Sequence, residues 1–177
     1  MSRRIIAILL DCGDTLIDES TEVKTDGDIS LRADLIPGAD TLLHELKRQG
    51  YPLALVGDGP AATFYNNLSP YGLYNLFDAY AISEEVGVHK PHPKIFLYAL
   101  NQLNIRPADY DKVVMVGNYL ARDIKGANNL GLISVWLDWS PRRPKTPADK
   151  SEAPEFIIKT PLELLQVIST LEETIKN

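Results

Sequence analysis

The stretch IIAILLDCGDTL, residues 5–16, decides the fold class. It opens with the continuous apolar run Ile5–Leu10 and turns polar at Asp11. A continuous apolar run of this length is typical of a strand buried on both faces, as in a parallel sheet. Ligands of parallel α/β sheets bind beyond the carboxyl ends of the strands, so Asp11 is the first candidate functional residue.

Further apolar runs follow, and segments with helical periodicity separate them. We predict strands at 53–56, 79–82, 113–116 and 133–137, and an edge strand at 156–158. Helices are predicted at 39–46, 61–68 and 93–103, from 124 to Gly131, and from the capping box Thr160–Glu163 to Ile175. This alternation favours an α/β fold: a three-layer, Rossmann-like, doubly wound parallel sheet with helices on both faces.

Length and composition bound the class of protein. A chain of 177 residues with 45% hydrophobic and 24% charged residues is expected to form a single globular domain over 1–177. The net charge of −6 gives no preference for nucleic acid or for an anionic membrane. The single cysteine, Cys12, excludes a disulfide framework and a cysteine-rich zinc site. No apolar run near the N-terminus reaches the length of a membrane span or signal peptide, so we expect a cytoplasmic protein.

Four segments in order resemble the motifs of the haloacid dehalogenase (HAD) superfamily, most of whose members are phosphatases. The segment LLDCGDTL at 9–16 is similar to the family's DxDGT motif, and VGVHKPHP at 86–93 closely matches GxxKPxP. The segment LALVGDG at 53–59 stands where the family usually has Ser or Thr before Asn-Gly, and VGNYLARD at 116–123 corresponds to GDxxxxD. The resemblance runs from about Ile5 to Leu165 and implies a HAD-like core.

The chemistry of these residues points the same way. A strand-end carboxylate with a lysine and further carboxylates nearby can hold an anion only if its own negative charge is offset, and a divalent cation does this. Hard oxygen ligands such as Asp11, Asp123 and a main-chain carbonyl suit Mg²⁺. With Lys90 and the metal offsetting charge on a phosphoryl group, Asp11 could attack phosphorus and form an aspartyl-phosphate. The resemblance implies the same nucleophile, so we predict a Mg²⁺-dependent phosphoric monoester hydrolase with Asp11 and Lys90 as catalytic residues.

The first motif departs from the family pattern at Gly13. When Thr15 and Leu16 set the register, the family's second aspartate, which protonates the leaving group and later activates water, falls on Gly13. Gly13 can offer its carbonyl to the metal but has no proton to give. General acid–base assistance is worth roughly 10²–10⁴-fold. The site is therefore expected to favour aryl or acyl phosphates, whose leaving groups need no proton.

Asp14 takes the family's glycine position, and two hypotheses compete for it. Asp14 could turn into the site as a surrogate acid, since aspartate tolerates unusual backbone angles better than most residues, and so it is a candidate catalytic residue. Alternatively, it points away and binds nearby backbone amides. We favour the second hypothesis because neighbouring residues of an extended chain face opposite ways.

Two more positions differ from the family. Gly57 lacks the hydroxyl that would hold a phosphoryl oxygen, but a Gly-Asp-Gly turn can present amides, so Gly57, Asp58 and Lys90 are the predicted phosphate-binding residues. Asn118 replaces one of the two acids of the last motif, and its amide oxygen can still bind Mg²⁺ with a weaker charge contribution. The predicted metal ligands are Asp11, Gly13, Asn118 and Asp123.

Two irregular segments flank the predicted site. The acidic stretch 17–36 is too short to bury a domain core and is expected to form a flap or minimal cap. The proline-rich stretch 138–155 is expected to be a rim loop, where Arg142, Arg143 and Lys145 either hold an anionic substrate tail or belong to a solvated linker. Capless relatives accept large substrates or close the site with a neighbouring subunit. A small phosphorylated substrate, a phosphorylated macromolecule and a homo-oligomer are all compatible with this pattern.

Three other functions compete with phosphatase activity. Gly13, Gly57 and Asn118 together suit a non-catalytic HAD domain that binds a phosphorylated ligand or a protein partner. Carbon–halogen hydrolysis needs no proton for its leaving group, but it requires a closed apolar pocket, and the missing cap argues against it. A receiver-like phosphate acceptor ranks last, because its chain is usually shorter and its lysine follows a later strand.

Overall fold

A six-stranded parallel sheet forms the centre of the computed structural model, which describes residues 4–173. The strands lie in the order β5 (Ala79–Ile82), β4 (Leu53–Gly57), β1 (Ala7–Leu10), β6 (Val113–Gly117), β7 (Ile133–Leu137) and β8 (Phe156–Ile158), and every neighbouring pair is parallel. The predicted doubly wound fold is thus confirmed. β1 begins two residues later than predicted, at Ala7.

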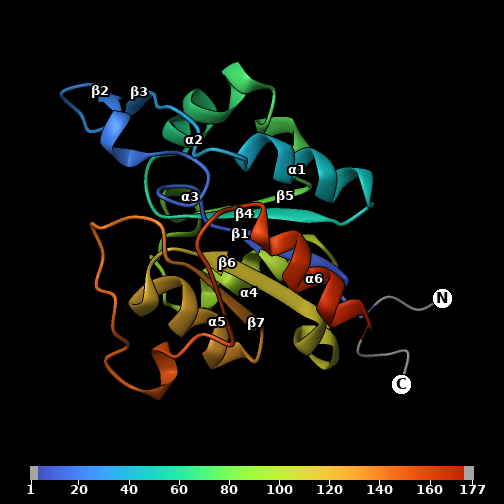
Figure 1. Cartoon of the computed structure of the whole chain (residues 1–177). Coiled ribbons are helices and arrows are strands. Elements are labelled where there is room, and N and C mark those ends of the chain that lie inside the picture. The colour runs from blue at the N-terminus through green and yellow to red at the C-terminus, as the bar shows by residue number, and fades with distance from the viewer. Residues whose placement is uncertain (1–3, 174–177) are drawn as a thin grey trace.

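Helices cover both faces of the sheet (Figure 1). One face carries α1 (Ala39–Arg48), α2 (Ala61–Leu68) and α6 (Glu163–Glu173), and the other carries α4 (Pro93–Gln102) and α5 (Lys125–Leu130). The short helix α3 (Ser83–Val86) precedes α4. α6 begins at Glu163, two residues later than its proline predicted, and the predicted end at Ile175 lies outside the described residues.

The side chains of β1 show why the sheet is buried on both sides. Ile8 and Leu10 pack with α1, α2 and α6, whereas Ala7 and Leu9 pack with α4 and α5. Successive residues of a strand face opposite ways, so a strand covered on both sides needs the continuous apolar run seen in the sequence. No helix within residues 4–173 combines the length and apolar character needed to cross a membrane.

Several short turns complete the chain. Five 3₁₀ turns span Glu19–Thr21 (η1), Ser69–Tyr71 (η2), Tyr74–Leu76 (η3), Pro107–Lys112 (η4) and Lys150–Glu152 (η6), and a π-helical turn spans Leu120–Ile124 (η5). The sequence pattern did not predict them, because each is too short for a hydrophobic period to be visible.

A small antiparallel hairpin of β2 (Val23–Lys24) and β3 (Ser30–Arg32) follows the first motif. It packs on α2, where the Ser30 hydroxyl donates to Asn67 Oδ1 at 2.9 Å. The Tyr71 hydroxyl donates to the carbonyl of Ala33 at 2.9 Å. Residues 17–36 therefore form a hairpin and one 3₁₀ turn rather than a cap domain.

The strand order reverses at β1. The chain passes from β1 through β4 to β5 on one side, and then places β6 on the other side of β1. Ligands of doubly wound sheets bind in the crevice that such a reversal opens at the carboxyl ends of the strands. Asp11 directly follows β1 at this point.

Candidate active site

Lys90 brings two carboxylates together at the strand reversal. Its Nζ lies 2.7 Å from Asp11 Oδ1 and 2.7 Å from Asp123 Oδ1, and it donates to the carbonyl of Val56 at 2.9 Å. The Lys90 side chain is only 3% exposed. Lys90 comes from the loop between α3 and α4, Asp11 from the end of β1 and Asp123 from the π turn after β6. Three distant segments thus converge on one buried charge cluster.

The charges of this cluster support one another. Burial acts to lower the pKa of the Lys90 ammonium, but Asp11, Asp123 and Asp58 outweigh it and raise that pKa above its ordinary value. Burial also raises the pKa of Asp123, Asp11 adds to the rise, and Lys90 opposes it. The two carboxylates beside the Lys90 ammonium therefore keep it in its charged form. Removing one partner of such a buried pair would leave an uncompensated charge in the interior.

Gly117 makes room for Asp123. A Cβ at Gly117 would overlap the Asp123 side chain, so a larger residue at this position would push the carboxylate out of place. Asp123 Oδ2 accepts a hydrogen bond from the backbone N–H of Tyr119 at 2.9 Å. The spacing between Gly117 and Asp123 in the last motif therefore has a local structural reason.

These residues line a cavity of about 300 Å³ at the carboxyl ends of the strands. The predicted residues around it are Asp11, Gly13, Asp58, Lys90, Asn118 and Asp123. The hairpin segment and the later loops add further charged or aromatic residues, among them Glu19, Glu22, Lys24, Tyr119, Arg122 and Arg143. Two predicted site residues, Asp14 and Gly57, are not part of this lining.

The residues that line the cavity include oxygen donors of the kind that suit Mg²⁺. Asp11 and Asp123 would offer carboxylates, Asn118 an amide oxygen and Gly13 a carbonyl, and Mg²⁺ typically takes one or two carboxylates and keeps several waters. Asp123 Oδ1 lies 2.7 Å from Lys90 Nζ, and Asn118 Nδ2 has no hydrogen-bond partner among the described residues. No three His, Cys, Asp or Glu side chains within 4–173 group as a metal site, in keeping with a set that has only two acids.

Asp14 faces the rim loop instead of the cavity. Its backbone φ is +52° and its side chain is fully buried. Asp14 Oδ2 accepts from Arg142 Nε at 2.9 Å, and Asp14 Oδ1 accepts from the backbone N–H of Glu19 at 3.1 Å. Arg142 also pairs with Asp18. This geometry agrees with the second hypothesis, in which Asp14 points away from the site.

Gly57 packs closely against the aromatic ring of Phe64. A Cβ at Gly57 would overlap the Phe64 ring, so the family's usual hydroxyl has no space here while Phe64 keeps its position. The backbone N–H of Gly59 donates to Ser83 Oγ at 2.9 Å and is already used. Asp58 does reach the cavity, where it accepts from the backbone N–H of Lys90 at 3.0 Å and from Arg122 at 3.1 Å.

The three cations predicted at the rim have different surroundings. Arg142 is held by Asp14 and Asp18, and Lys145 pairs with Asp138. Only Arg143 lines the cavity. It donates to Glu19 Oε2 at 3.1 Å, and its guanidinium lies 5.1 Å from the centre of the Tyr119 ring.

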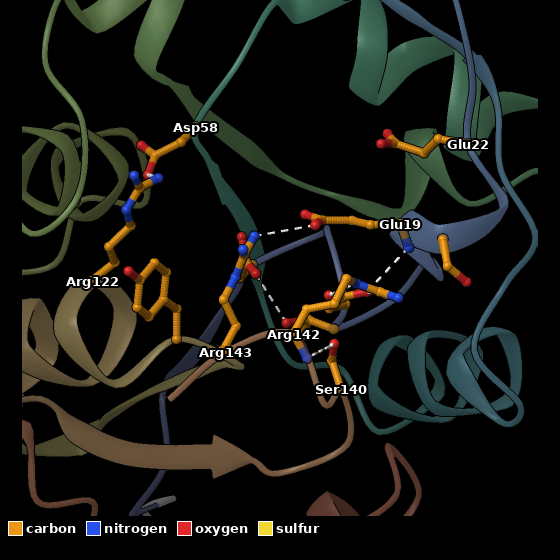
Figure 2. Close-up of polar contacts among 12 residues, drawn as sticks. Glu19, Glu22, Asp58, Arg122, Ser140, Arg142 and Arg143 are labelled. Carbon is orange, nitrogen blue, oxygen red and sulfur yellow. Dashed lines mark hydrogen bonds and ion pairs between the residues drawn. The ribbon is translucent and has the colours of Figure 1, made fainter. Parts of the chain in front are cut away.

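Several cavity residues were not predicted from the sequence, among them Glu19, Tyr119 and Arg122. The guanidinium of Arg122 lies 5.3 Å from the Tyr119 ring centre, and Arg122 also pairs with Asp58 (Figure 2). Tyr119 and Arg122 lie inside the last motif, and their place there could have identified them as site residues. Glu19 is one of several acids in the stretch 17–36, and nothing in the sequence distinguishes it from the others.

Comparisons with known proteins agree with this geometry. The family model described as haloacid dehalogenase-like hydrolase matches residues 12–137. A glyceraldehyde 3-phosphate phosphatase of Methanopyrus kandleri is 36% identical over 78% of this chain and 56% of the relative. A phosphoserine phosphatase of Thermus thermophilus is 34% identical over 71% of this chain and 47% of the relative. The chain thus spans about half the length of the curated relatives it matches.

A solved structure extends the likeness to the fold. The HAD phosphatase from Thermococcus onnurineus superposes with a TM-score of 0.75 at 22% identity, over 93% of this chain and 98% of that one. At this identity the likeness concerns the fold alone. Together with the matched family model, the ordered motifs and the cluster around Lys90, it places this chain in the haloacid dehalogenase-like hydrolase family.

Proposed function

We propose that this chain is a phosphatase that hydrolyses a small phosphoric monoester through an aspartyl-phosphate on Asp11. The observation that carries the proposal is the buried ammonium of Lys90, 2.7 Å from both Asp11 Oδ1 and Asp123 Oδ1 at the edge of the cavity. The names of the relatives support it, because each describes the removal of phosphate from a small molecule.

The chain's own groups orient the nucleophile. Asp11 Oδ2 accepts a hydrogen bond from Thr15 Oγ1 at 3.0 Å, while Oδ1 faces Lys90. This arrangement fixes the carboxylate at the carboxyl end of β1. From there it attacks phosphorus and displaces the leaving group. The Lys90 ammonium offsets negative charge that builds up on the phosphoryl oxygens in the transition state. Mg²⁺ held by Asp11, Gly13, Asn118 and Asp123 would supply further charge neutralisation.

The proposal is tested by the hydrolysis of p-nitrophenyl phosphate. Turnover is expected in the presence of Mg²⁺ and should disappear when EDTA removes the metal. It should also disappear in Asp11→Asn, which keeps the shape of the side chain but removes the negative charge of the nucleophilic oxygen. Asp138→Asn is the matched control, because Asp138 also follows a central strand but lies outside the cavity lining. Equal turnover in wild type and Asp11→Asn would refute the proposal.

A second candidate function is the binding of a phosphorylated ligand without turnover. It is favoured by the Phe64 ring, which fills the space of a side chain at Gly57 and leaves that position without a phosphate-binding hydroxyl. This hypothesis predicts that inorganic phosphate with Mg²⁺ raises the melting temperature while no ester is hydrolysed. Hydrolysis that depends on Asp11 would exclude it.

A further inference from the structure

The cavity contains a carboxyl group where the first motif lacks one. A Cβ at Gly13 would overlap the end of the Glu19 side chain, with Glu19 Cδ 2.9 Å away. Glu19, Gly13 and Asp11 all line the same cavity. The Glu19 carboxyl therefore occupies the space into which a side chain at position 13 would project.

The surroundings of Glu19 hold it in this position. Glu19 opens the 3₁₀ turn η1, and its backbone N–H donates to Asp14 Oδ1 at 3.1 Å. Arg143, from the rim loop, donates to Glu19 Oε2 at 3.1 Å (Figure 2). The contact with Arg143 occupies Oε2, whereas Oε1 is the oxygen that a side chain at Gly13 would meet first.

We propose that Glu19 is the general acid and base of this site, in place of the aspartate missing at position 13; the inference rests on the proposed phosphatase function. As Asp11 attacks phosphorus and the bond to the leaving oxygen breaks, the Glu19 carboxyl gives its proton to that oxygen, and an alcohol departs. The Glu19 carboxylate then takes a proton from water as the water oxygen attacks phosphorus. The bond to Asp11 breaks, phosphate leaves, and both carboxyl groups return to their starting states.

The decisive experiment compares leaving groups in Glu19→Gln, which keeps the size and the contact with Arg143 but cannot donate the proton. The rate of leaving-group release is measured in the first turnover by rapid quench, before the base role of Glu19 is needed. On p-nitrophenyl phosphate, whose leaving group needs no proton, less than a tenfold loss is expected. On the alkyl ester glycerol 2-phosphate, whose leaving group does need one, a loss of roughly 10²-fold or more is expected. Ser20→Ala is the control, because it removes a hydrogen bond from the same turn and lies outside the cavity lining.

A second set of variants tests whether an acid at position 13 can take over the role of Glu19. Gly13→Asp alone is expected to gain less than about tenfold on glycerol 2-phosphate, because its side chain displaces Glu19 and replaces one acid by another. Glu19→Ala should lose activity on glycerol 2-phosphate, and adding Gly13→Asp to Glu19→Ala should restore it. In this double variant, the carboxyl group that fills the space comes from position 13 instead of from position 19.

Three results would overturn the role of Glu19: equal losses of first-turnover release on both esters in Glu19→Gln, a gain of about 10²-fold in Gly13→Asp alone, or no rescue in the double variant. An increased Mg²⁺ requirement without a change in leaving-group dependence would also overturn it, since Glu19 would then serve the metal. Each of these outcomes leaves hydrolysis dependent on Asp11. Failure of the proposed function is a different result, because Asp11→Asn would then match wild type.

Discussion

At the residue scale, the first motif shows how moving an acid by one position changes its role. Asp14 adopts a φ of +52°, in the left-handed region that costs most residues about 1–2 kcal/mol. Its carboxylate offsets this cost by accepting bonds from Arg142 and from the backbone N–H of Glu19. An acid at position 14 therefore joins the rim loop to the first motif and leaves the cavity to another group.

This role predicts the effect of Asp14→Asn. Asparagine can still accept the hydrogen bond from the Glu19 N–H, but it loses the charge that pairs with Arg142. Arg142 is one-third exposed, so we expect a loss of only about 1–2 kcal/mol in the free energy of unfolding, measured by urea denaturation. The ratio of activities on p-nitrophenyl phosphate and glycerol 2-phosphate should change far less than in Glu19→Gln. A change as large as that in Glu19→Gln would identify Asp14 as the acid.

Cys12 gives a second prediction at this scale. Its side chain is 1% exposed, and burial followed by the nearby Asp11 carboxylate raises the pKa of the thiol well above its ordinary value. Because the thiolate is the reactive form, native protein should not react with iodoacetamide at neutral pH, whereas protein unfolded in urea should react fully. Modification of the native protein, detected by mass spectrometry, would show that the thiol is accessible and ionised.

At the element scale, the sequence predicted the strands better than the turns. Buried parallel strands need continuous apolar runs, and the six runs correspond to the six strands. Asp11, Lys90 and Asp123 could be selected because each belongs to a motif near the carboxyl edge of the sheet. The position of Glu19 could not be predicted, because its contact with Arg143 joins residues 124 positions apart. The same is true of Asp14, whose direction depends on Arg142.

The hairpin β2–β3 provides a prediction about local stability. The Ser30 hydroxyl and the Asn67 side chain are fully buried and bonded to each other at 2.9 Å. Asn67→Ala removes the shorter of the two contacts of that hydroxyl and leaves only the longer one to the Arg32 carbonyl at 3.3 Å, at a cost of about 1–3 kcal/mol. Backbone amides of residues 23–32 should then exchange with deuterium faster than those of the central strands. Exposed Asn101→Ala in α4 is the control, and equally faster exchange throughout the chain would contradict a local effect.

At the scale of the whole molecule, two loops far apart in the chain meet over the carboxyl ends of the strands (Figure 1). Residues 17–36 and 138–155 are joined by the pair between Arg142 and Asp18 and by the pair between Arg143 and Glu19. A sheet of this kind needs covering elements at its carboxyl edge to keep a charged cavity partly out of water. In this chain, ion pairs between loops cover that edge within the described residues, without a cap domain.

Asp138 links the rim loop to the last strand and gives a pH-dependent prediction. Burial acts to raise the pKa of Asp138, but Lys145 and Lys159 outweigh it and lower that pKa below its ordinary value. A carboxyl group with a lowered pKa in the folded state stabilises the protein at neutral pH. This stabilisation is lost as the pH falls from the unfolded-state pKa of about 4 through the folded-state pKa.

Asp138→Asn should therefore destabilise the protein at pH 7 and lose its effect in acid. Both lysines are more than 40% exposed, so we expect a loss of only about 1 kcal/mol at pH 7. Urea unfolding of wild type and variant at a series of pH values should show the difference shrinking as the pH falls below about 4. Asp26→Asn, at an exposed position of the hairpin, is the control. A difference that stays constant down to pH 2 would mean that Asp138 acts through its shape and hydrogen bonds, and that charge does not hold the rim loop against β8.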